Sequence, residues 1–378
     1  MLKQSLLIFE LRMMGDAVMS LPFVRAAKQK YTVFVCCQPS VADVFRTLLP
    51  DEQLVLWRPP WLDEEKKYSL SKWKHAEIKP VLQRLRAVRA QIAITVWADA
   101  RIHLLMALSG AIERIGFPMN ARNVYASQLT WRRRQILIGR GLNLIGSLGL
   151  GRKLLTQKFF RADYFQHHVR DWRQLAETLD LNWNVEFPWF SAPQVSLPKR
   201  LSIWLEDARR SGQKIWLLHP GARTPNRRWP LEQFRALIEQ TFLPGGMPLI
   251  VIDPMESRLA PGRLPGVFTY CPASLAEFFG IVNAVDCVVC NDTGVGHVAA
   301  ALGKRVVSIF SANRPEWFAP YGNLDLTAAK DVCPHRPCLN HCVMPSYICL
   351  EAVTVEMVKR QIEKLNSPCA QIDAPLLS

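Results

Sequence analysis

Two series of short apolar segments alternating with helical segments restrict the fold of this chain more than any other feature. In the first series, residues 6–9, 32–35, 54–56 and 92–96 are typical of buried strands, and residues 18–30 and 76–90 have helical periodicity. The second series has apolar runs at 215–218, 249–252, 287–290 and 305–310, with helical segments at 231–240 and 274–282 and a helix ending near 302. Such alternation favours mostly parallel sheets, so we predict two α/β domains.

A proline-rich stretch at residues 187–198 lies between the two series and lacks helical periodicity. We therefore predict an N-terminal domain over 1–187, a linker over 188–200 and a C-terminal domain over 201–352. Residues 353–378 are expected to form a closing helix and tail, with the option of packing back on the N-terminal domain. The length of 378 residues is comfortable for two domains.

The composition excludes a disordered chain, because 49% of the residues are hydrophobic and 21% are charged. No apolar run approaches the ~18 residues of a transmembrane helix. The first residues lack the apolar core and cleavage site of a signal peptide, so we expect a cytoplasmic location. Ten cysteines in a long chain without an export signal do not indicate a disulfide framework.

The net charge of +15 suits a nucleic acid, an anionic membrane face or a phosphorylated substrate. The basic character is concentrated in residues 114–162, which contain no Asp or Glu and interleave Arg and Lys with apolar residues. Two interpretations stay open: a solvated basic surface with an insertion loop, or a surface that binds anionic lipid or an anionic acceptor at a membrane.

Arg12, Gly15 and Asp16 follow the first predicted strand, where the chain turns into a helix. Gly15 permits a tight turn, and backbone N–H groups at a helix start can face an anion. Asp16 is expected at the carboxyl end of the strand, where open α/β sheets place their ligands. It is interpreted either as a helix cap or as a general base that takes a proton from an acceptor hydroxyl.

Two motifs in the second series are typical of phosphate binding. After the strand at 215–218, Arg227 and Arg228 can clamp a diphosphate through paired hydrogen bonds, unless they form an exposed basic loop. After the strand at 287–290, the amides of Thr293 and Gly294 are expected to face a phosphate at a helix start. The last motif adds Asp292, a possible acceptor from a sugar hydroxyl, and His297, one turn into the helix.

These three motifs, in this order, resemble glycosyltransferase family 9, the heptosyltransferase-like enzymes of bacterial lipopolysaccharide assembly. The matching segments read LLIFELRMMGDAVMSLPFVRAAK, LLHPGARTPNRRWPLEQFRALI and CVVCNDTGVGHVAAALGKRVVSIF. The resemblance runs with gaps from about residue 5 to 365 and weakens between about 98 and 162. It implies a GT-B fold, two Rossmann-like domains facing across a cleft, with acceptor on the N-terminal domain and nucleotide sugar on the C-terminal one.

The resemblance also implies inverting transfer without a metal ion or other cofactor. The general base of the family falls on Asp16, beside Arg12 and Gly15, and its diphosphate-binding turn on Asp292, Thr293, Gly294 and His297. A donor-binding residue that is usually lysine falls on Arg227, with Arg228 next to it, and this departure replaces a point charge by a planar fork. The acidic residue that holds the ribose falls loosely on Glu256.

The implied partners are a nucleotide sugar, most directly ADP-heptose, and an anionic glycolipid acceptor met at the inner membrane, without nucleic acid. A relative that uses another nucleotide sugar has the same phosphate turn, because phosphate recognition reads neither base nor sugar. A nucleic-acid-binding protein is the alternative from another class, although no helix-turn-helix, finger or RNA-binding signature is present. A dinucleotide-dependent oxidoreductase lacks its Gly-x-Gly-x-x-Gly sequence after the first strand.

Four cysteines near the C-terminus raise the question of a metal. Cys333, Cys338, Cys342 and Cys349 lie within a short span, interleaved with His335 and His341. A structural zinc site is conceivable, but the spacing is not the paired Cys-x2-Cys form. The resemblance does not imply a metal there, so no metal ligand is assigned, and the zinc site stays an open alternative.

Overall fold

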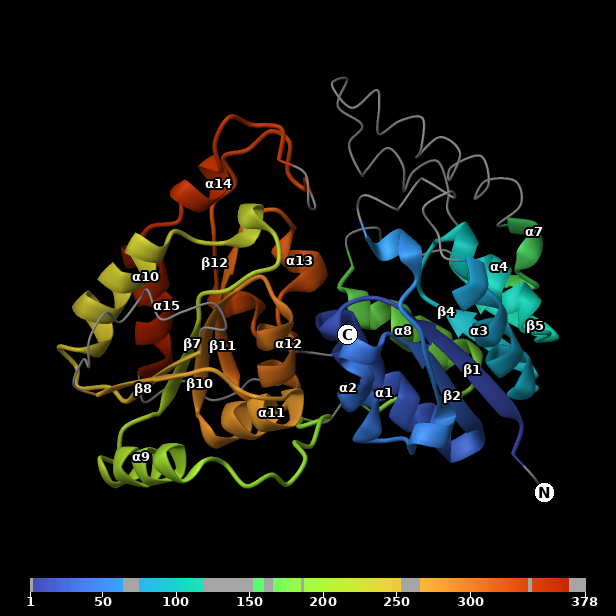
Figure 1. Cartoon of the computed structure of the whole chain (residues 1–378). Coiled ribbons are helices and arrows are strands. Elements are labelled where there is room, and N and C mark those ends of the chain that lie inside the picture. The colour runs from blue at the N-terminus through green and yellow to red at the C-terminus, as the bar shows by residue number, and fades with distance from the viewer. Residues whose placement is uncertain are drawn as a thin grey trace. The chain divides into compact units, whose positions relative to one another are not determined.

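The computed structural model describes residues 3–63, 75–118, 152–159, 166–184, 187–252, 266–338 and 342–366. The chain divides into two compact units, Met1–Val185 and Glu186–Ser378. In its described part, each unit contains one sheet of six parallel strands with helices on both faces (Figure 1). The predicted α/β class and the two-domain organisation are thereby confirmed.

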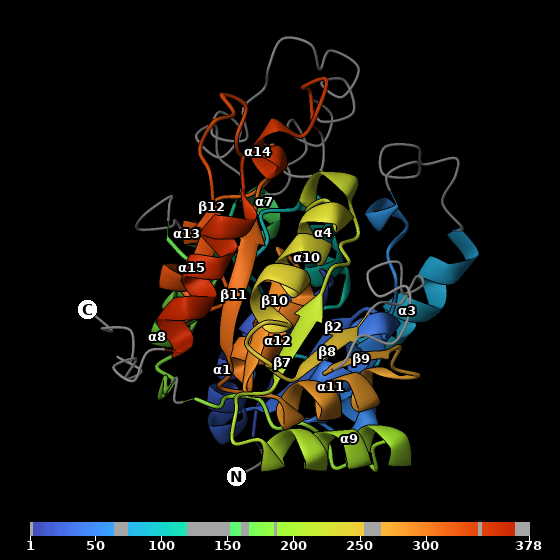
Figure 2. The same ribbon diagram turned by 90° about the vertical axis from the view of Figure 1, so that its left-hand side faces the viewer.

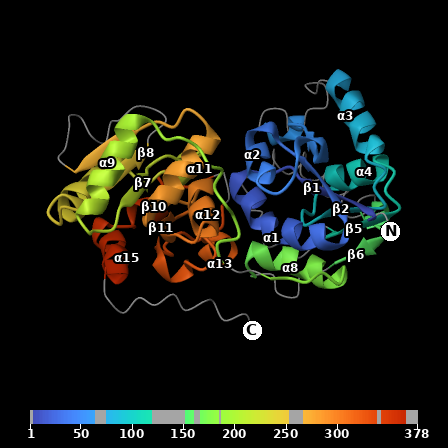
Figure 3. The ribbon, with the colours of Figure 1, turned by 90° about the horizontal axis from the view of Figure 1, so that it is seen from below.

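The sheet of the first unit has the strand order β3-β2-β1-β4-β5-β6. Its strands are β1 (Ser5–Glu10), β2 (Thr32–Cys37), β3 (Leu54–Leu56), β4 (Ile92–Thr95), β5 (Glu113–Gly116) and β6 (Gln157–Lys158). Its helices are α1 (Met14–Lys30), α2 (Ala42–Arg46), α3 (His75–Ala87), α4 (Ala100–Leu108), α7 (Arg152–Leu154) and α8 (His168–Thr178), with short 3-10 turns at Pro39–Val41, Asp51–Gln53 and Pro60–Leu62. Helices α1 and α8 pack together on one face of the sheet, while α3 and α4 cover the other (Figure 3).

The sheet of the second unit has the order β12-β11-β10-β7-β8-β9. Its strands are β7 (Trp216–His219), β8 (Leu249–Ile252), β9 (Val267–Tyr270), β10 (Cys287–Asn291), β11 (Arg305–Phe310) and β12 (Thr327–Ala329). Its helices are α9 (Lys199–Arg210), α10 (Leu231–Leu237), the π-helical turn η8 (Ile238–Phe242), α11 (Leu275–Ala284), α12 (Gly294–Ala301), α13 (Pro315–Phe318), α14 (Ile348–Glu351) and α15 (Val355–Asn366), with 3-10 turns at Pro225–Arg227 and Leu324–Leu326. Helices α10 and α15 lie together on one face, opposite α11 and α12 (Figure 2).

The central strands form where the sequence is apolar without interruption, because both faces of a parallel sheet are covered by helices. Strand β1 is buried at five of its six positions, and β10 at all five. Strands β5, β6, β9 and β12, at or next to the sheet edges, are not among the predicted elements. They are short and half-exposed, so they lack the continuous apolar run that identifies the central strands.

Two boundaries differ from the sequence prediction. The stretch predicted as a linker contains Trp189 and Phe190, which are 2% and 1% exposed. Trp189 packs 5.3 Å from the ring of Tyr321, and Phe190 packs edge-on 5.0 Å from Phe279, so the stretch belongs to the second unit. Burial of these two large rings outweighs the extended, proline-rich character of the segment.

Helix α15 also belongs to the second unit, although the sequence allowed it to pack back on the N-terminal domain. It contacts α10, β11 and β12 and supplies Val358, Ile362 and Leu365 to their hydrophobic core. The tail beyond residue 366 lies outside the described residues, as do 119–151, where most of the basic segment falls.

Both sheets have the strand order of a dinucleotide-binding fold, in which the chain reverses its direction of growth next to the first strand. The reversal points lie between β1 and β4 in the first unit and between β7 and β10 in the second. Ligands of such sheets bind outside the carboxyl ends of the strands at this point. The turns after β1 and after β10 carry the predicted site residues, so the fold places both groups where ligands are expected.

Candidate active site

The turn after β1 brings Arg12, Gly15 and Asp16 together at the carboxyl edge of the first sheet. Gly15 is buried in the first turn of α1. Asp16 is the third residue of that helix, and its Oδ2 accepts the N–H of Met13 at 3.1 Å. This bond caps the helix in the manner of a capping box, so the cap interpretation of Asp16 is correct as far as that oxygen is concerned.

Side chains from two neighbouring strands hold this turn. Gln38, just after β2, donates from Nε2 to the carbonyl oxygens of Leu11 at 3.1 Å and Arg12 at 2.6 Å. Trp97, just after β4, lies under the guanidinium of Arg12, whose Cζ is 4.2 Å from the ring centroid. Cation–π stacking of this kind orients an arginine without consuming its hydrogen-bond donors.

Glu10, the last residue of β1, is a functional candidate that the sequence analysis missed. Its side chain is fully buried. Its Oε1 accepts the N–H of Arg12 at 3.1 Å, and its Oε2 accepts the indole N–H of Trp97 at 2.9 Å. Burial, and then the negative charge of Asp16, raise the pKa of Glu10 to about 8. A carboxyl group inside an apolar strand was the available signal, because acids are rarely fully buried and strongly perturbed acids cluster at functional sites.

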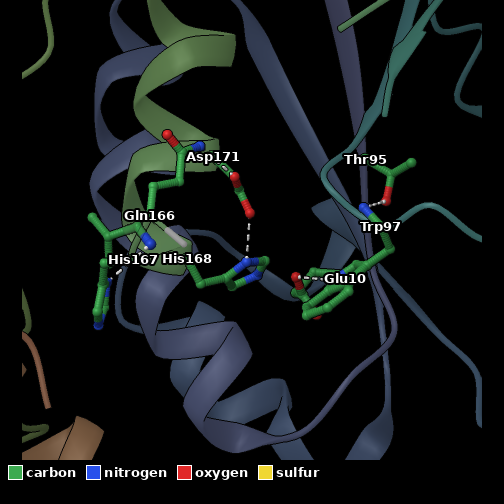
Figure 4. A network of polar contacts seen from close by, with 8 residues as sticks. Glu10, Thr95, Trp97, Gln166, His167, His168 and Asp171 are labelled. Atoms are coloured by element: carbon green, nitrogen blue, oxygen red, sulfur yellow. Dashed lines mark hydrogen bonds and ion pairs between the residues drawn. The ribbon is translucent and has the colours of Figure 1, made fainter. Parts of the chain in front are cut away.

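A buried polar network continues from Trp97 into α8 (Figure 4). The imidazole of His168 lies 4.4 Å from the Trp97 ring, centroid to centroid. Its Nδ1 is 2.8 Å from Oδ2 of Asp171, and the other oxygen of Asp171 accepts from Gln166 at 2.7 Å. The network connects the turn that carries Asp16 to helix α8 through contacts that exclude water, since both His168 and Asp171 are at most 2% exposed.

In the second unit, Asn291 organises the turn after β10. Its Oδ1 accepts the N–H of Trp229 at 3.1 Å, and its Nδ2 donates to the carbonyl oxygens of Pro220 at 2.7 Å and Gly221 at 3.3 Å. One buried amide thus joins the loop after β7 to the turn after β10. Asn291 was not among the predicted site residues, because nothing in its own strand shows what it bonds to.

Asp292 lies next to Asn291 at the start of the α12 turn and is 5% exposed. Its Oδ2 accepts from Nδ2 of Asn313 at 2.8 Å and is 3.6 Å from an Nη of Arg227. The structure therefore brings Arg227 and Asp292 together, as a shared site requires. Arg336, which is nearly buried, donates from Nε to the carbonyl of Asn313 at 2.9 Å and braces the same corner.

Arg228 behaves differently from Arg227. Its Nε donates to the carbonyl of Ala222 at 2.6 Å, and one Nη donates to the carbonyl of Arg223 at 3.3 Å. The guanidinium thus closes its own loop, which leaves Arg227 as the arginine held at Asp292. Glu256 lies outside the described residues, so its predicted place beside a ribose stays a prediction.

Helix α12 presents its N-terminus at this corner. Thr293 is the N-cap residue and Gly294 the first helical residue, and the first amides of a helix have no partner within it. His297, one turn along, is 7% exposed. Gly296 is required for packing, since a Cβ there would stand 2.9 Å from Cγ of Pro320 and 3.1 Å from Sγ of Cys290. The helix therefore lies close to the sheet, with its positive end toward Asp292 and Arg227.

The loop after β7 adds a neutral histidine. Burial lowers the pKa of His219 to about 4, so its imidazole is uncharged at neutral pH. Gly221 lies against that ring, and a Cβ at Gly221 would be 3.0 Å from its Cε1. This close contact explains the glycine in the His219-Pro220-Gly221 sequence better than turn formation does.

The cysteines near the C-terminus are close enough to influence one another. The pKa of the Cys349 thiol is raised to about 11, mainly by burial and in smaller steps by the nearby thiols of Cys338, Cys333 and Cys342. Asn226 donates to Sγ of Cys338 at 3.6 Å, which connects the cluster to the 3-10 turn of Arg227. Within the described residues, no three His, Cys, Asp or Glu side chains are arranged to hold a metal ion.

The chain is similar in sequence to known glycosyltransferases. Residues 144–348, more than half of the chain, match the family model described as glycosyltransferase family 9 (heptosyltransferase). The chain is 28% identical over 203 residues to lipopolysaccharide heptosyltransferase 1 of Pseudomonas aeruginosa. That match covers 50% of this chain and 53% of the relative, so the chain spans about half the length of the curated relative it matches.

Solved structures with the same fold align over nearly the whole chain. One is the Escherichia coli heptosyltransferase WaaC with ADP, at a TM-score of 0.63 and 19% identity, covering 96% of this chain and 99% of that one. Another is a family 9 glycosyltransferase from Veillonella parvula, at a TM-score of 0.65 and 15% identity, covering 97% and 99%. These likenesses establish the fold of two Rossmann-like units, the GT-B fold, as predicted from the sequence.

Proposed function

The chain belongs to glycosyltransferase family 9, and from this membership we propose that it transfers a sugar from a nucleotide sugar to the hydroxyl group of an acceptor. The proposed donor is ADP-heptose, and the proposed acceptor is a lipopolysaccharide-type glycan of the bacterial surface. The matched relative is a lipopolysaccharide heptosyltransferase, and the Escherichia coli heptosyltransferase of the same fold has been solved with ADP.

The observation that supports the donor site most is the corner formed by Arg227, Asp292 and the N-terminus of α12. A guanidinium 3.6 Å from a nearly buried carboxylate lies at the positive end of a helix, at the reversal point of a parallel sheet. A diphosphate bound there meets the guanidinium and the first amides of α12, through Thr293 and Gly294. The proposed roles are that Asp292 accepts from a hydroxyl of the sugar and that His297 donates to a phosphate oxygen.

Asp16 is the proposed general base. The acceptor oxygen attacks the anomeric carbon on the face opposite the nucleotide, a new C–O bond forms there, and the proton of the hydroxyl passes to Asp16. The bond between the anomeric carbon and the diphosphate oxygen breaks, and the nucleoside diphosphate leaves with the electron pair. The configuration at the anomeric carbon is therefore inverted.

We propose that this reaction needs no metal ion. The negative charge that develops on the leaving diphosphate is met by Arg227 and by the helix dipole of α12, which are fixed before the reaction begins. Undiminished transfer in the presence of a strong chelator is the expected result. A loss of transfer that Mg²⁺ or Mn²⁺ restores would contradict the proposal.

The donor is tested by calorimetry in the presence of chelator, with ADP-heptose compared with UDP-, GDP- and CMP-sugars. Selective binding of ADP-heptose supports the heptosyltransferase function. Selective binding of another sugar nucleotide keeps the mechanism and changes the pathway. Binding of none, together with tight sequence-selective DNA binding at physiological salt, would favour the nucleic-acid alternative.

The base is tested with Asp16→Asn. This variant is expected to keep ADP binding and to lose transfer by a factor of about 10² to 10⁴, the usual contribution of general-base catalysis. Asp51→Asn is the matched control, since Asp51 is exposed and, among the residues that the structure describes, forms its ion pair with Arg46 on the surface of the same unit. Full activity of Asp16→Asn would remove Asp16 from the base role.

We also propose that the protein works on the cytoplasmic face of the inner membrane as a peripheral protein. The net charge of +15 and the acid-free segment 114–162 favour contact with an anionic surface. None of the helices that the structure describes is long and apolar enough to cross a membrane. Sedimentation with anionic but not neutral liposomes, weakened by salt, is expected. Equal sedimentation with both would contradict peripheral electrostatic binding.

A further inference from the structure

Glu10 lies directly behind the turn that carries the proposed base. Its two carboxyl oxygens accept from the backbone N–H of Arg12 and from the indole of Trp97, at 3.1 and 2.9 Å. Asp16 accepts from the next backbone N–H, that of Met13. Two acidic side chains therefore hold successive amides of a single turn, one from the strand before it and one from the helix after it.

Burial and the neighbouring Asp16 both disfavour a negative charge on Glu10. Asp16 on α1 is the neighbouring acid, and its charge repels a charge on Glu10. Arg12 is the neighbouring cation, and its charge favours ionisation of Glu10, but its side chain is exposed and lies over Trp97, with Cζ 4.2 Å from the ring centroid. On β2, burial raises the pKa of the Cys37 thiol to about 12, so that thiol is neutral. On the β4 side, Glu10 meets the uncharged indole of Trp97.

From this arrangement we propose that Glu10 is a positioning residue for Asp16, which acts in its protonated form. The neutral carboxyl group accepts one N–H group on its carbonyl oxygen and the other on its hydroxyl oxygen, which holds the turn, and Asp16 is the ionised acid of the pair. This inference rests on the proposed general-base role of Asp16. Its physical basis is that a fully buried acid next to a second, ionised acid cannot itself ionise without a large electrostatic cost.

The protonation of Glu10 can be measured without any substrate. Infrared titration of wild type minus Glu10→Gln isolates the carbonyl band of the protonated acid. That band is expected to disappear with a midpoint near the pKa of about 8. In Asp16→Asn the midpoint is expected to fall, because the repelling charge is gone. A Glu10 that is already ionised at neutral pH, or a midpoint that Asp16→Asn leaves unchanged, overturns the proposal.

The positioning role is measured by transfer kinetics across pH. An amide at position 10 can accept only one of the two hydrogen bonds, so Glu10→Gln is expected to lower kcat about tenfold at neutral pH, equivalent to one lost bond. The change in rate that wild type shows as Glu10 ionises is expected to vanish in this variant. Glu113→Gln, on an exposed position of β5 in the same sheet, is the matched control.

Binding of ADP distinguishes a failure of the proposed glycosyltransferase function from a failure of the proposed role of Glu10. Wild type, Glu10→Gln and Glu113→Gln are expected to bind ADP equally, since both changes lie in the first unit and the proposed donor site lies in the second. If no variant binds any nucleotide or transfers any sugar, the proposed function fails, while the infrared titration still decides whether Glu10 is protonated. If transfer occurs and Glu10→Gln keeps both the wild-type kcat and its pH profile, Glu10 has no positioning role.

Discussion

The side-chain amide of Asn291 is expected to stabilise the proposed donor site more than any other single uncharged group in it. Asn291→Ala removes the acceptor of the Trp229 N–H and the donor to the Pro220 carbonyl, both of which are buried. Each unsatisfied buried group costs about 1 to 3 kcal/mol, so the second unit is expected to lose about 2 to 6 kcal/mol of unfolding free energy. Affinity for ADP is expected to fall at least about tenfold, because the loop before Arg227 is no longer fixed.

Because the chain has two units, its unfolding is best followed separately in each. Amide hydrogen exchange in β7 and β10 reports the second unit, and exchange in β1 reports the first. Asn283→Ala is the matched control, since Asn283 is exposed on α11 of the same unit. Protection is expected to drop in β7 and β10 of Asn291→Ala, to stay unchanged in β1, and to stay unchanged everywhere in Asn283→Ala.

Asn291→Asp distinguishes lost hydrogen bonds from lost volume. Aspartate keeps the shape and the acceptor for Trp229, but its second oxygen faces the carbonyl oxygens of Pro220 and Gly221. It is expected to be at least as destabilising as alanine at neutral pH and to recover at lower pH, where the protonated acid regains a donor. Losses below about 1 kcal/mol in both variants, or no pH-dependent recovery, would refute the reasoning.

Three further changes test other parts of the structure. Arg227→Ala is expected to weaken ADP binding by about tenfold to a hundredfold, as for a lost charge-assisted bond, while Arg228→Ala leaves affinity within about a factor of two in the same calorimetry. Gly296→Ala forces a Cβ to within 2.9 Å of Pro320 and is expected to cost about 1 to 3 kcal/mol in urea unfolding. Burial raises the pKa of Glu10 from 4.5 to about 8, so the native state keeps a proton that the unfolded state releases, and stability is expected to fall as pH rises across this interval. Glu10→Gln is expected to remove that fall, which is at most about 5 kcal/mol of unfolding free energy and is measured by denaturation at the two ends of the pH interval. An unchanged pH dependence would contradict the raised pKa of Glu10.

The sequence by itself determined the fold class and the two-domain organisation. Uninterrupted apolar runs such as 6–9 and 287–290 identify strands covered on both faces, and the helices between them identify parallel sheets. The short motif around Asp292 was recognisable because a strand, a polar turn and a small-residue helix are consecutive in the chain. The helix predicted at 274–282 is also present, and the side chain of Ser274 caps it by accepting the N–H of Glu277. Each of these features is local.

Tertiary structure decided what depends on contacts between distant segments. Trp189 and Phe190 read as linker residues, and only their contacts with Tyr321 and Phe279 assign them to the second unit. Arg227 and Arg228 are equivalent in sequence, yet the first meets Asp292 and the second bonds to its own loop.

The same holds for the two residues that the sequence analysis missed. Glu10 receives one of its two hydrogen bonds from Trp97, 87 residues further along the chain, and Asn291 joins segments 62 to 71 residues away. Periodicity reports whether a side chain faces the core, because burial of apolar area follows the local repeat of a strand or helix. It does not report which partner a buried polar group finds. That choice depends on the directional geometry of hydrogen bonds between strands far apart in sequence, which only the folded sheet brings together.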